Sequence, residues 1–336
     1  MAPLSLPMRV FYFLSRIGLI QDTGQKSLAQ RILVAWSLLT KKRLYTKAIV
    51  PSVFLTALRV LLGKTRHKFL LPQPIDLDIL PSNLASLGEV YAYFRLVSVS
   101  PEHNKLVWEV GPNWHLITHT DYGQDIAVMR EVFLQKVYGA HYNGLQVIDI
   151  GAYHGETMLF FLWQGCQSIV VVEPYPPAVK RIEELVRINN LDKKVRLFPV
   201  AVGKENGESW LLVSPNDLLS NALQNEHPNQ APTTFSEKIV VPVWTFSRLI
   251  EEIGWDAVDV AKVDCEGGEY AILLHTPPEI LKRVKVWVVE FHKGAGLLVE
   301  KFREMGYEVA WEERPDKVGM LRAWQPGAKL PWDHAR

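Results

Sequence analysis

Polar side chains end four predicted strands in the second half of the chain, and their types suit chemistry on hydroxyl groups. Carboxylates accept hydrogen bonds from hydroxyls, and a carboxylate or an imidazole can take a proton from one. Because the carboxyl ends of parallel strands meet at one edge of a sheet, these residues are expected to share a single cleft. The four sets are Asp149 with Gly151, Glu173, Asp264 with Glu266, and Glu290 with His292.

The strands that carry these residues alternate with helical patterns, which is typical of a doubly wound α/β fold with a mostly parallel sheet. Apolar runs predict strands at 146–150, 168–172, 195–200, 258–263 and 284–289. Helices are expected at 156–164, from Pro176 onward, after an N-cap at Thr245, and at 297–305. Two final strands, at 307–311 and 319–324, give the sheet an antiparallel C-terminal edge.

The turn after the first of these strands suits a polar or anionic ligand. It reads Asp149-x-Gly151-x-x-x-Gly155 and presents backbone amides at the start of a helix. Glu173 ends the next strand, where a carboxylate can accept both ribose hydroxyls of an adenosine cofactor. Both NAD and S-adenosylmethionine meet this description.

Two features of the turn favour S-adenosylmethionine. A dinucleotide fingerprint needs Gly-x-Gly-x-x-Gly so that the pyrophosphate can approach the backbone, and the middle glycine is missing here. A carboxylate at Asp149 would also repel a pyrophosphate, whereas a sulfonium or ammonium group tolerates negative charge nearby. The alternative for Asp149 is a purely structural carboxylate that bonds to the amides of the turn.

Four sequence blocks together resemble the FkbM family of methyltransferases in order and spacing, over roughly residues 120–295. They are Val-Ile-Asp-Ile-Gly-Ala-Tyr-His-Gly-Glu-Thr, Val-Val-Glu-Pro, Phe-Pro-Val-Ala-Val-Gly and Lys-Val-Asp-Cys-Glu-Gly-Gly-Glu. The last block departs mildly from the family pattern, because Gly268 stands where an alanine is usual. The resemblance implies a class I S-adenosylmethionine-dependent fold and methylation, typically of a hydroxyl on a sugar or secondary metabolite.

The resemblance also implies which residues form the site. Those expected to hold S-adenosyl-L-methionine are Asp149, Gly151, Ala152, Gly155, Thr157, Glu173 and Ala201. Asp264, Glu266 and Glu269 match the acidic block of the family, and Asp264 is expected to face the methyl-transfer centre.

A hydroxyl acceptor benefits from a general base, since methyl transfer otherwise depends on positioning alone. The candidates are Asp264, His292 and, as a weaker choice, His154, with Glu266 as a further catalytic residue. Glu266 and Glu269 could instead order their turn through backbone amides, and His292 could be an ordinary surface histidine. A divalent metal on Asp264 is a minority alternative, and no metal site is predicted.

The N-terminal segment is strongly basic, although the whole 336-residue chain carries a formal charge of only +1. Residues 1–70 contain twelve Lys and Arg against one acidic residue, which leaves about −10 for the remainder. Residues 1–72 are expected to form a basic helical extension. It is interpreted as a cap or oligomerisation element, or as a helix on an anionic membrane surface, and a nucleic-acid role is disfavoured.

The remaining boundaries follow from composition. Residues 73–120 are expected to contain a linker (72–87) and a small β-meander (91–118). The methyltransferase domain is expected to span 121–326 and to begin with a helix at 124–137. Residues 327–336 are expected to form a tail. A loop of about 25 residues between strands at 209–213 and 239–243 is predicted to be a lid or substrate contact.

Two cysteines without a disulfide or zinc pattern favour a reducing compartment. A cytoplasmic enzyme is therefore expected, with peripheral contact at the inner membrane face as an option. The rival functions are a nicotinamide-dependent oxidoreductase and a non-catalytic binding module.

Overall fold

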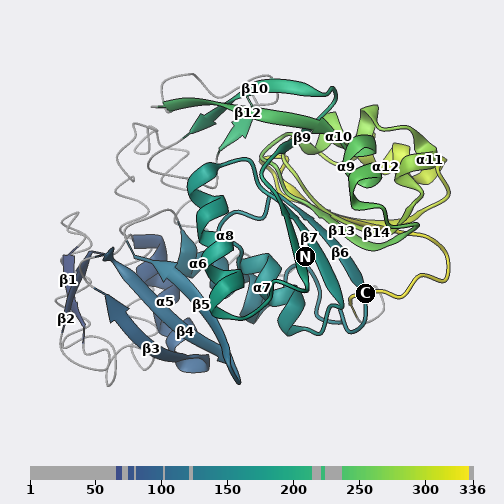
Figure 1. The fold of residues 1–336 in the computed structure, drawn as a ribbon. Helices are drawn as coiled ribbons and strands as arrows, with labels where there is room; N and C mark the ends of the chain where they lie inside the picture. Colours follow the sequence, from purple (N-terminus) through teal and green to yellow (C-terminus); the bar gives the residue numbers. More distant parts are fainter. Residues whose placement is uncertain are drawn as a thin grey trace. The chain divides into compact units, whose positions relative to one another are not determined.

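The computed structural model describes residues 66–69, 75–78, 81–100, 103–120, 124–213, 221–223 and 237–332, with side chains from residue 86 onward. The chain divides into two compact units, residues 1–134 and 135–336 (Figure 1). Within the described ranges, no helix is both long enough and apolar enough to cross a membrane. The predicted basic extension lies outside the described residues, apart from a short strand, β1, at Arg66–Phe69.

The first unit contains the predicted β-meander, but the predicted linker is wrong. Residues 72–87 instead include strand β2 (Ile75–Asp78), antiparallel to β1, and most of helix α5 (Pro81–Tyr93). Prolines 72, 74 and 81 suggested a linker, yet proline is tolerated in the first turn of a helix, where Pro81 lies. Leu87 and Val90 are fully buried on one side of α5. The antiparallel meander is β3 (Arg95–Ser100), β4 (Lys105–Gly111) and β5 (Trp114–His119).

The helix predicted at 124–137 is shorter and changes type along its length. It begins as α6 (Asp125–Met129) and continues as a π-helix, η2 (Arg130–Gln135). Ile126, Met129 and Phe133 lie on the buried side of this segment and are at most 2% exposed. Apolar spacing alone does not distinguish the wider π turn from an α turn.

A seven-stranded sheet forms the framework of the second unit and confirms the predicted α/β fold. Its strand order is β15-β16-β14-β13-β6-β7-β8. The five strands from β14 to the edge strand β8 are parallel, and β16 is antiparallel to both of its neighbours. This order, with one antiparallel strand inserted near the edge, is the class I methyltransferase sheet. The strands are β6 (Gln146–Ile150), β7 (Ser168–Val172), β8 (Val195–Phe198), β13 (Val258–Val263), β14 (Val284–Phe291), β15 (Glu308–Glu313) and β16 (Gly319–Trp324).

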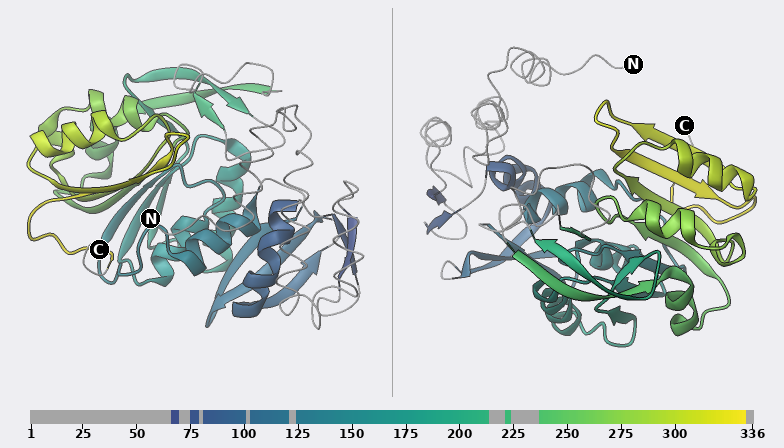
Figure 2. Two further views of the ribbon diagram at one scale, coloured as in Figure 1. Left: turned by 180° about the vertical axis from the view of Figure 1, so that it is seen from behind. Right: turned by 90° about the horizontal axis from the view of Figure 1, so that it is seen from above.

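Helices cover both faces of this sheet (Figures 1 and 2). On one face lie α7 (Glu156–Trp163) and α8 (Pro176–Ile188), and on the other lie α9 (Phe246–Ile253), α10 (Glu269–His275), α11 (Pro278–Leu281) and α12 (Gly296–Glu304). The predicted N-cap is confirmed, because the Thr245 hydroxyl accepts a hydrogen bond from the amide of Arg248 at 3.2 Å. Phe246, Leu249, Ile250 and Ile253 of α9 are buried in the core beside Trp287 and Phe302.

A second, four-stranded sheet replaces the end of the predicted third strand and part of the long loop. Its order is β11 (Ala222–Leu223), β10 (Gly207–Val213), β12 (Glu237–Thr245) and β9 (Ala201–Gly203). The strand predicted at 195–200 ends at Phe198, because Pro199 has no amide hydrogen to continue the ladder. The long loop is not structureless throughout, because its residues Ala222 and Leu223 form β11, which pairs with Leu212 and Leu211 of β10. Its other residues, 214–220 and 224–236, lie outside the described residues.

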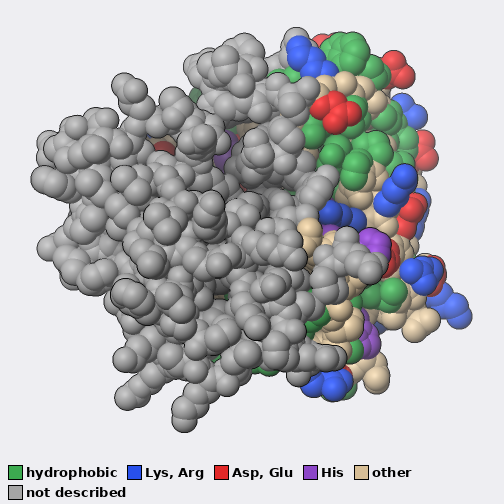
Figure 3. All heavy atoms as spheres, turned by 90° about the vertical axis from the view of Figure 1, so that its left-hand side faces the viewer, with side chains coloured by type: hydrophobic (Ala, Val, Ile, Leu, Met, Phe, Trp, Pro, Cys, Tyr) green, Lys and Arg blue, Asp and Glu red, His purple; other side chains and the backbone are tan. Residues whose placement is uncertain are grey.

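The surface of the described part is mixed in charge. Figure 3 shows one face on which the described basic and acidic side chains are interspersed with apolar ones. At the C-terminal end, the carbonyl of Pro331 accepts hydrogen bonds from the amides of Ala140 and His141 at 2.6 and 2.9 Å. Part of the segment predicted to be a tail is therefore hydrogen-bonded to the segment that precedes β6.

Candidate active site

A cleft lies at the carboxyl ends of β6, β7 and β13, in the second unit. The chain runs outward from β6 to β8 and then returns to place β13 on the other side of β6, and ligands of open α/β sheets bind at this reversal. The walls combine apolar side chains with three carboxyl groups. The apolar residues include Ile150, Val172, Val200, Val202, Leu211 and Leu223, and the acidic ones are Glu173, Asp264 and Glu266.

The turn after β6 packs tightly against the turn after β13. Gly151 has φ +77°, and a Cβ atom added there would lie 1.8 Å from the carbonyl oxygen of Asp264. No side chain larger than hydrogen fits, so a glycine is required for the two turns to form one wall of the cleft. Tyr153, which also lines the cleft, has φ +52°, a left-handed conformation that is uncommon for non-glycine residues.

Glu173 lies at the end of β7 and is only 7% exposed. Its Oε2 accepts a hydrogen bond from the amide of Tyr153 at 3.0 Å, and its Oε1 accepts one from the amide of Tyr175 at 2.9 Å. These bonds fix the carboxyl group at the cleft wall while each oxygen keeps a second lone pair for a ligand hydroxyl. Burial raises the pKa of Glu173 to about 7, although the two backbone hydrogen bonds and Lys262 oppose the shift.

This raised pKa predicts a pH dependence of folding stability. The pKa of about 7 in the folded state exceeds the ordinary value of 4.5, so the folded protein holds the proton more tightly than the unfolded chain. The contribution of Glu173 to stability is therefore full below pH 4.5 and falls as pH rises toward 7, by up to about 3 kcal/mol. Urea unfolding of the wild type and of Glu173→Gln at pH 4.5 and 7.5 measures this pH-dependent change in the free energy of unfolding. The wild type should lose stability relative to the variant across this interval, and equal pH profiles would contradict the prediction.

Lys262 is the main residue that the sequence prediction missed. It is paired with Asp149 in the register of β13 and β6, so both side chains emerge on the same face of the sheet. Its Nζ lies 3.2 Å from Asp149 Oδ1 and 3.8 Å from Asp264 Oδ2, and it donates a hydrogen bond to the carbonyl of Gly151. Burial disfavours its charge, but Asp149 and Asp264 together raise the pKa of Lys262 above its ordinary value.

Asp149 is fully buried beneath the turn and does not line the cleft. Besides its ion pair with Lys262, it accepts a hydrogen bond from the Thr157 hydroxyl. The sequence argument treated its charge as free to repel a pyrophosphate, and the structure corrects that argument, because the charge is paired inside the protein. Its direct contact with a cofactor remains a prediction.

Asp264 presents a partly exposed carboxylate to the cleft. Its side chain is 24% exposed, and Tyr138 Oη donates a hydrogen bond to its Oδ2 at 3.0 Å. Burial, followed by the charge of Asp264, raises the pKa of Tyr138 well above its ordinary value, so the phenol keeps its proton and serves as the donor. Tyr138 was also missed, since no apolar periodicity marks its stretch of sequence.

His292 and Glu266 lie on neighbouring strand-end loops. His292 Nε2 is 3.6 Å from Glu266 Oε2, while its Nδ1 is 3.0 Å from Glu269 Oε1. Burial would lower the pKa of His292, but the hydrogen bond to Glu269 and the charges of Glu269, Glu266 and Asp264 raise it to about 10. Glu269 itself accepts from the amides of Gly267 and His292, which agrees with the alternative that this glutamate orders the loop.

The structure brings only part of the predicted site together around the cleft. Gly151, Glu173, Ala201, Asp264 and Glu266 line it, whereas Ala152, Gly155, Thr157 and His292 are not among the lining residues. Gly155 has φ +92° and precedes α7, where Thr157 supports Asp149.

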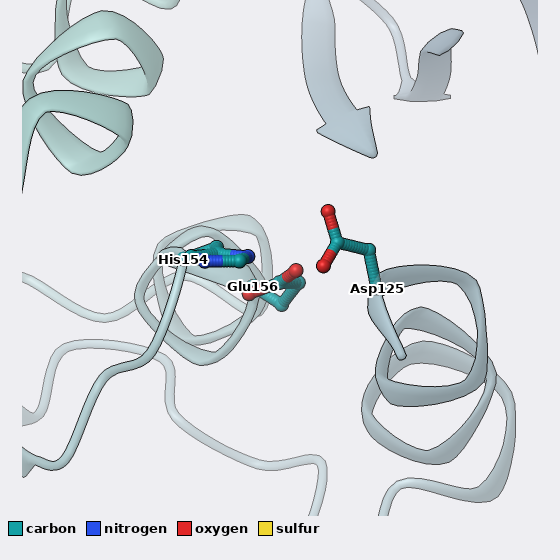
Figure 4. Close-up of side chains that lie close together, drawn as sticks. All are labelled: Asp125, His154 and Glu156. Atoms are coloured by element: carbon teal, nitrogen blue, oxygen red, sulfur yellow. The ribbon is translucent and has the colours of Figure 1, made fainter. Parts of the chain in front are cut away.

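His154, the weaker candidate base, is 2% exposed and does not line the cleft. Figure 4 shows it in the turn before α7, near Glu156 in the first turn of that helix. Its Nδ1 lies 2.8 Å from Arg181 Nη1, so it is bonded toward α8.

Comparison with known proteins agrees with this geometry. Residues 149–309 match the family model described as a methyltransferase FkbM domain. The chain therefore carries a methyltransferase domain of the FkbM family. A curated relative, the 31-O-demethyl-FK506 methyltransferase FkbM of Streptomyces tacrolimicus, is 26% identical over 240 residues, which are 61% of this chain and 90% of the relative. The matched range begins at Asp149 and includes every residue that lines the cleft, which attributes the cleft to the FkbM-family domain.

Solved structures also align with the chain. The methyltransferase FkbM of Methylobacillus flagellatus KT aligns with a TM-score of 0.37 and 14% identity, over 54% of this chain and 43% of that protein, less than half of its length. A putative tRNA (m1A22) methyltransferase of Streptococcus pneumoniae, solved in complex with S-adenosyl-L-methionine, aligns with a TM-score of 0.37 and 14% identity, over 59% of this chain and 73% of that protein.

Proposed function

We propose that the protein is an S-adenosylmethionine-dependent O-methyltransferase that acts on a hydroxyl of a saccharide, glycolipid or secondary metabolite. The observation that carries the proposal is the pairing, in one cleft, of a buried ribose-type acceptor with a partly exposed carboxylate. Glu173 supplies the first and Asp264 the second. The FkbM family of the domain and the name of its curated relative, a 31-O-demethyl-FK506 methyltransferase, support the proposal.

The cleft suits an adenosine cofactor on chemical grounds. Glu173 is held by two backbone amides and has lone pairs left for the two ribose hydroxyls. An adenine ring would lie against the apolar residues Val200 and Val202, where Ala201 offers its backbone. Gly151 and Tyr153 come from the turn next to Glu173 and complete that wall. Bound S-adenosylmethionine supplies a methyl group on a sulfonium, which a nucleophile displaces in line.

Asp264 is the residue that we assign to the acceptor side. A neutral hydroxyl is a poor nucleophile, so it reacts faster when a carboxylate takes its proton as the bond to the methyl group forms. The hydrogen bond from Tyr138 and the nearby ammonium group of Lys262 fix the orientation of the Asp264 carboxylate.

The proposal places the enzyme in the cytoplasm, where both cysteines stay reduced. Cys166 and Cys265 are free thiols in the structure, and burial raises the pKa of Cys166 to about 12, which disfavours the reactive thiolate. The acceptor is expected to be a small molecule or glycan.

Transfer of a labelled methyl group tests the proposed function directly. The full chain would be incubated with methyl-labelled S-adenosylmethionine and a panel of saccharides, glycolipids and hydroxylated metabolites. The proposal expects label on an oxygen of at least one of them, located by mass spectrometry and NMR. Label on a nitrogen or carbon atom, or turnover with a nicotinamide instead, would overturn it.

A further inference from the structure

We infer that Asp264, Glu266 and His292 form a binding site for one divalent cation of the Mn²⁺ and Mg²⁺ class. Each offers one ligand atom, and the three atoms lie within 4.8 Å of one another. They come from two adjacent loops, after β13 and at the end of β14. A cation between these loops would lie beside the cleft, because Asp264 and Glu266 line it.

Glu269 aims the histidine at this site. It is fully buried, and its Oε1 accepts hydrogen bonds from the backbone amide of His292 at 2.7 Å and from Nδ1 at 3.0 Å. With Nδ1 held as a donor to a carboxylate, Nε2 is the nitrogen that faces Glu266, and it would release its proton on binding an ion. A carboxylate behind a histidine is the usual outer support of metal-binding imidazoles, since it fixes both the tautomer and the ring orientation.

The outer nitrogen of His292 faces Glu266 at a spacing that suits two ligands of one ion. The His292 side chain is 9% exposed, and its Nε2 lies 3.6 Å from Glu266 Oε2. That separation exceeds the usual length of a hydrogen bond. It falls within the spacing of about 3.0–3.7 Å between neighbouring ligands that each lie about 2.1 Å from one metal ion.

The donor set indicates which ion binds. Two carboxylates and one imidazole give mostly hard oxygen ligands, which suit Mg²⁺ and Mn²⁺, and the imidazole favours Mn²⁺ of the two. Thiolate donors, which favour softer metals, are absent from this group of three.

The role of the ion rests on the proposed function, whereas its binding does not. A divalent ion held there would lower the pKa of an acceptor hydroxyl bound to it, so the hydroxyl would pass its proton more readily to the carboxylate of Asp264. Asp264 would then hold the ion and share in activating the hydroxyl. The ion also fixes the position of the acceptor oxygen at the cleft.

Mn²⁺ binding to the full chain tests the inference without any activity measurement. Electron paramagnetic resonance should detect one bound Mn²⁺ per chain, displaced by excess Mg²⁺, with coupling to an imidazole nitrogen in pulsed spectra. His292→Gln should abolish that coupling, and Asp264→Asn and Glu266→Gln should each weaken binding by at least about tenfold. Glu269→Gln should weaken it by about 10–100-fold, because it acts only through His292. His275→Gln, an exposed histidine of α10, is the matched control and should change nothing.

The outcomes separate the two proposals. Absence of stoichiometric Mn²⁺ binding in a chain that binds S-adenosylmethionine would overturn the metal site alone, as would Mn²⁺ binding that all three ligand variants retain. Mn²⁺ bound as expected, without methyl transfer to any hydroxyl, would count against the proposed function alone. Circular dichroism confirms that each variant is folded.

Discussion

Replacing Lys262 by methionine is expected to lower the free energy of unfolding by about 3–5 kcal/mol. Methionine fills a similar volume but leaves Asp149, which is fully buried, without its cation at 3.2 Å. Thr157 alone cannot compensate a buried carboxylate, which must then stay unpaired or take up a proton. Urea unfolding, followed by fluorescence and circular dichroism, measures the loss.

Two further variants make the stability prediction specific. The double variant Lys262→Met/Asp149→Asn removes both charges and should regain part of the loss, so the two effects should not add. Lys285→Met breaks an ion pair with Asp259 in which the lysine side chain is 46% exposed, and it should cost less than about 1 kcal/mol. A loss of similar size for Lys262→Met and Lys285→Met would mean that the buried pair has no special role.

Replacing Asp264 by asparagine is expected to lower kcat for methyl transfer by about 10²–10⁴-fold. Asparagine keeps the shape of the side chain but can neither accept a proton from a hydroxyl nor contribute a charged ligand to a cation. The affinity for S-adenosylmethionine should change much less, because Glu173 lies on a different strand and is held by its own amides. Steady-state kinetics with an acceptor found by labelled transfer, alongside calorimetry of the donor, measures both quantities.

The control for this variant is Asp192→Asn, an exposed aspartate in the turn after α8. It should leave kcat and donor affinity unchanged. If Asp264→Asn transfers methyl groups at the wild-type rate, Asp264 neither activates the acceptor nor holds an ion required for transfer. If it loses donor binding and catalysis equally, its role lies in the shape of the cleft.

Local sequence patterns were sufficient to predict the framework of the sheet. The strand at 258–263 and the strands at 146–150 and 168–172 are found at the predicted residues, because buried parallel strands are short, mostly apolar runs with clear ends. Glu173 could be predicted as well, since its position at a strand end depends only on the strand.

Partners across the sheet could not be predicted in the same way. Lys262 is a lysine within a strand that is otherwise mostly apolar, which is itself a signal, since a lysine is almost never fully buried unless it is paired. Its partner Asp149 lies more than a hundred residues earlier, and only the register between β13 and β6 brings the two together. Tyr138 reaches Asp264 from an irregular segment, so no periodicity identifies it.

The remaining differences between the predicted and observed elements lie in the backbone conformation of segments whose apolar pattern looks regular. The π-helix at Arg130–Gln135 and the separation of β8 from β9 both preserve the apolar pattern that suggested a single regular element. The interpretation of 72–87 as a linker gave too much weight to prolines that lie outside α5 or in its first turn. In the first two cases the apolar pattern was interpreted correctly, and only the geometry of the backbone was not.

Titration of S-adenosylmethionine into the wild type and into Glu173→Ala by calorimetry tests the central claim most directly. The account predicts one site per chain in the wild type and an affinity lower by on the order of 100-fold or more in the variant, since two hydrogen bonds from ribose hydroxyls to a carboxylate are lost. Glu183→Ala, an exposed glutamate of α8, should bind as the wild type does. Equal affinities in the wild type and Glu173→Ala, or binding of NADH in place of S-adenosylmethionine, would contradict the account.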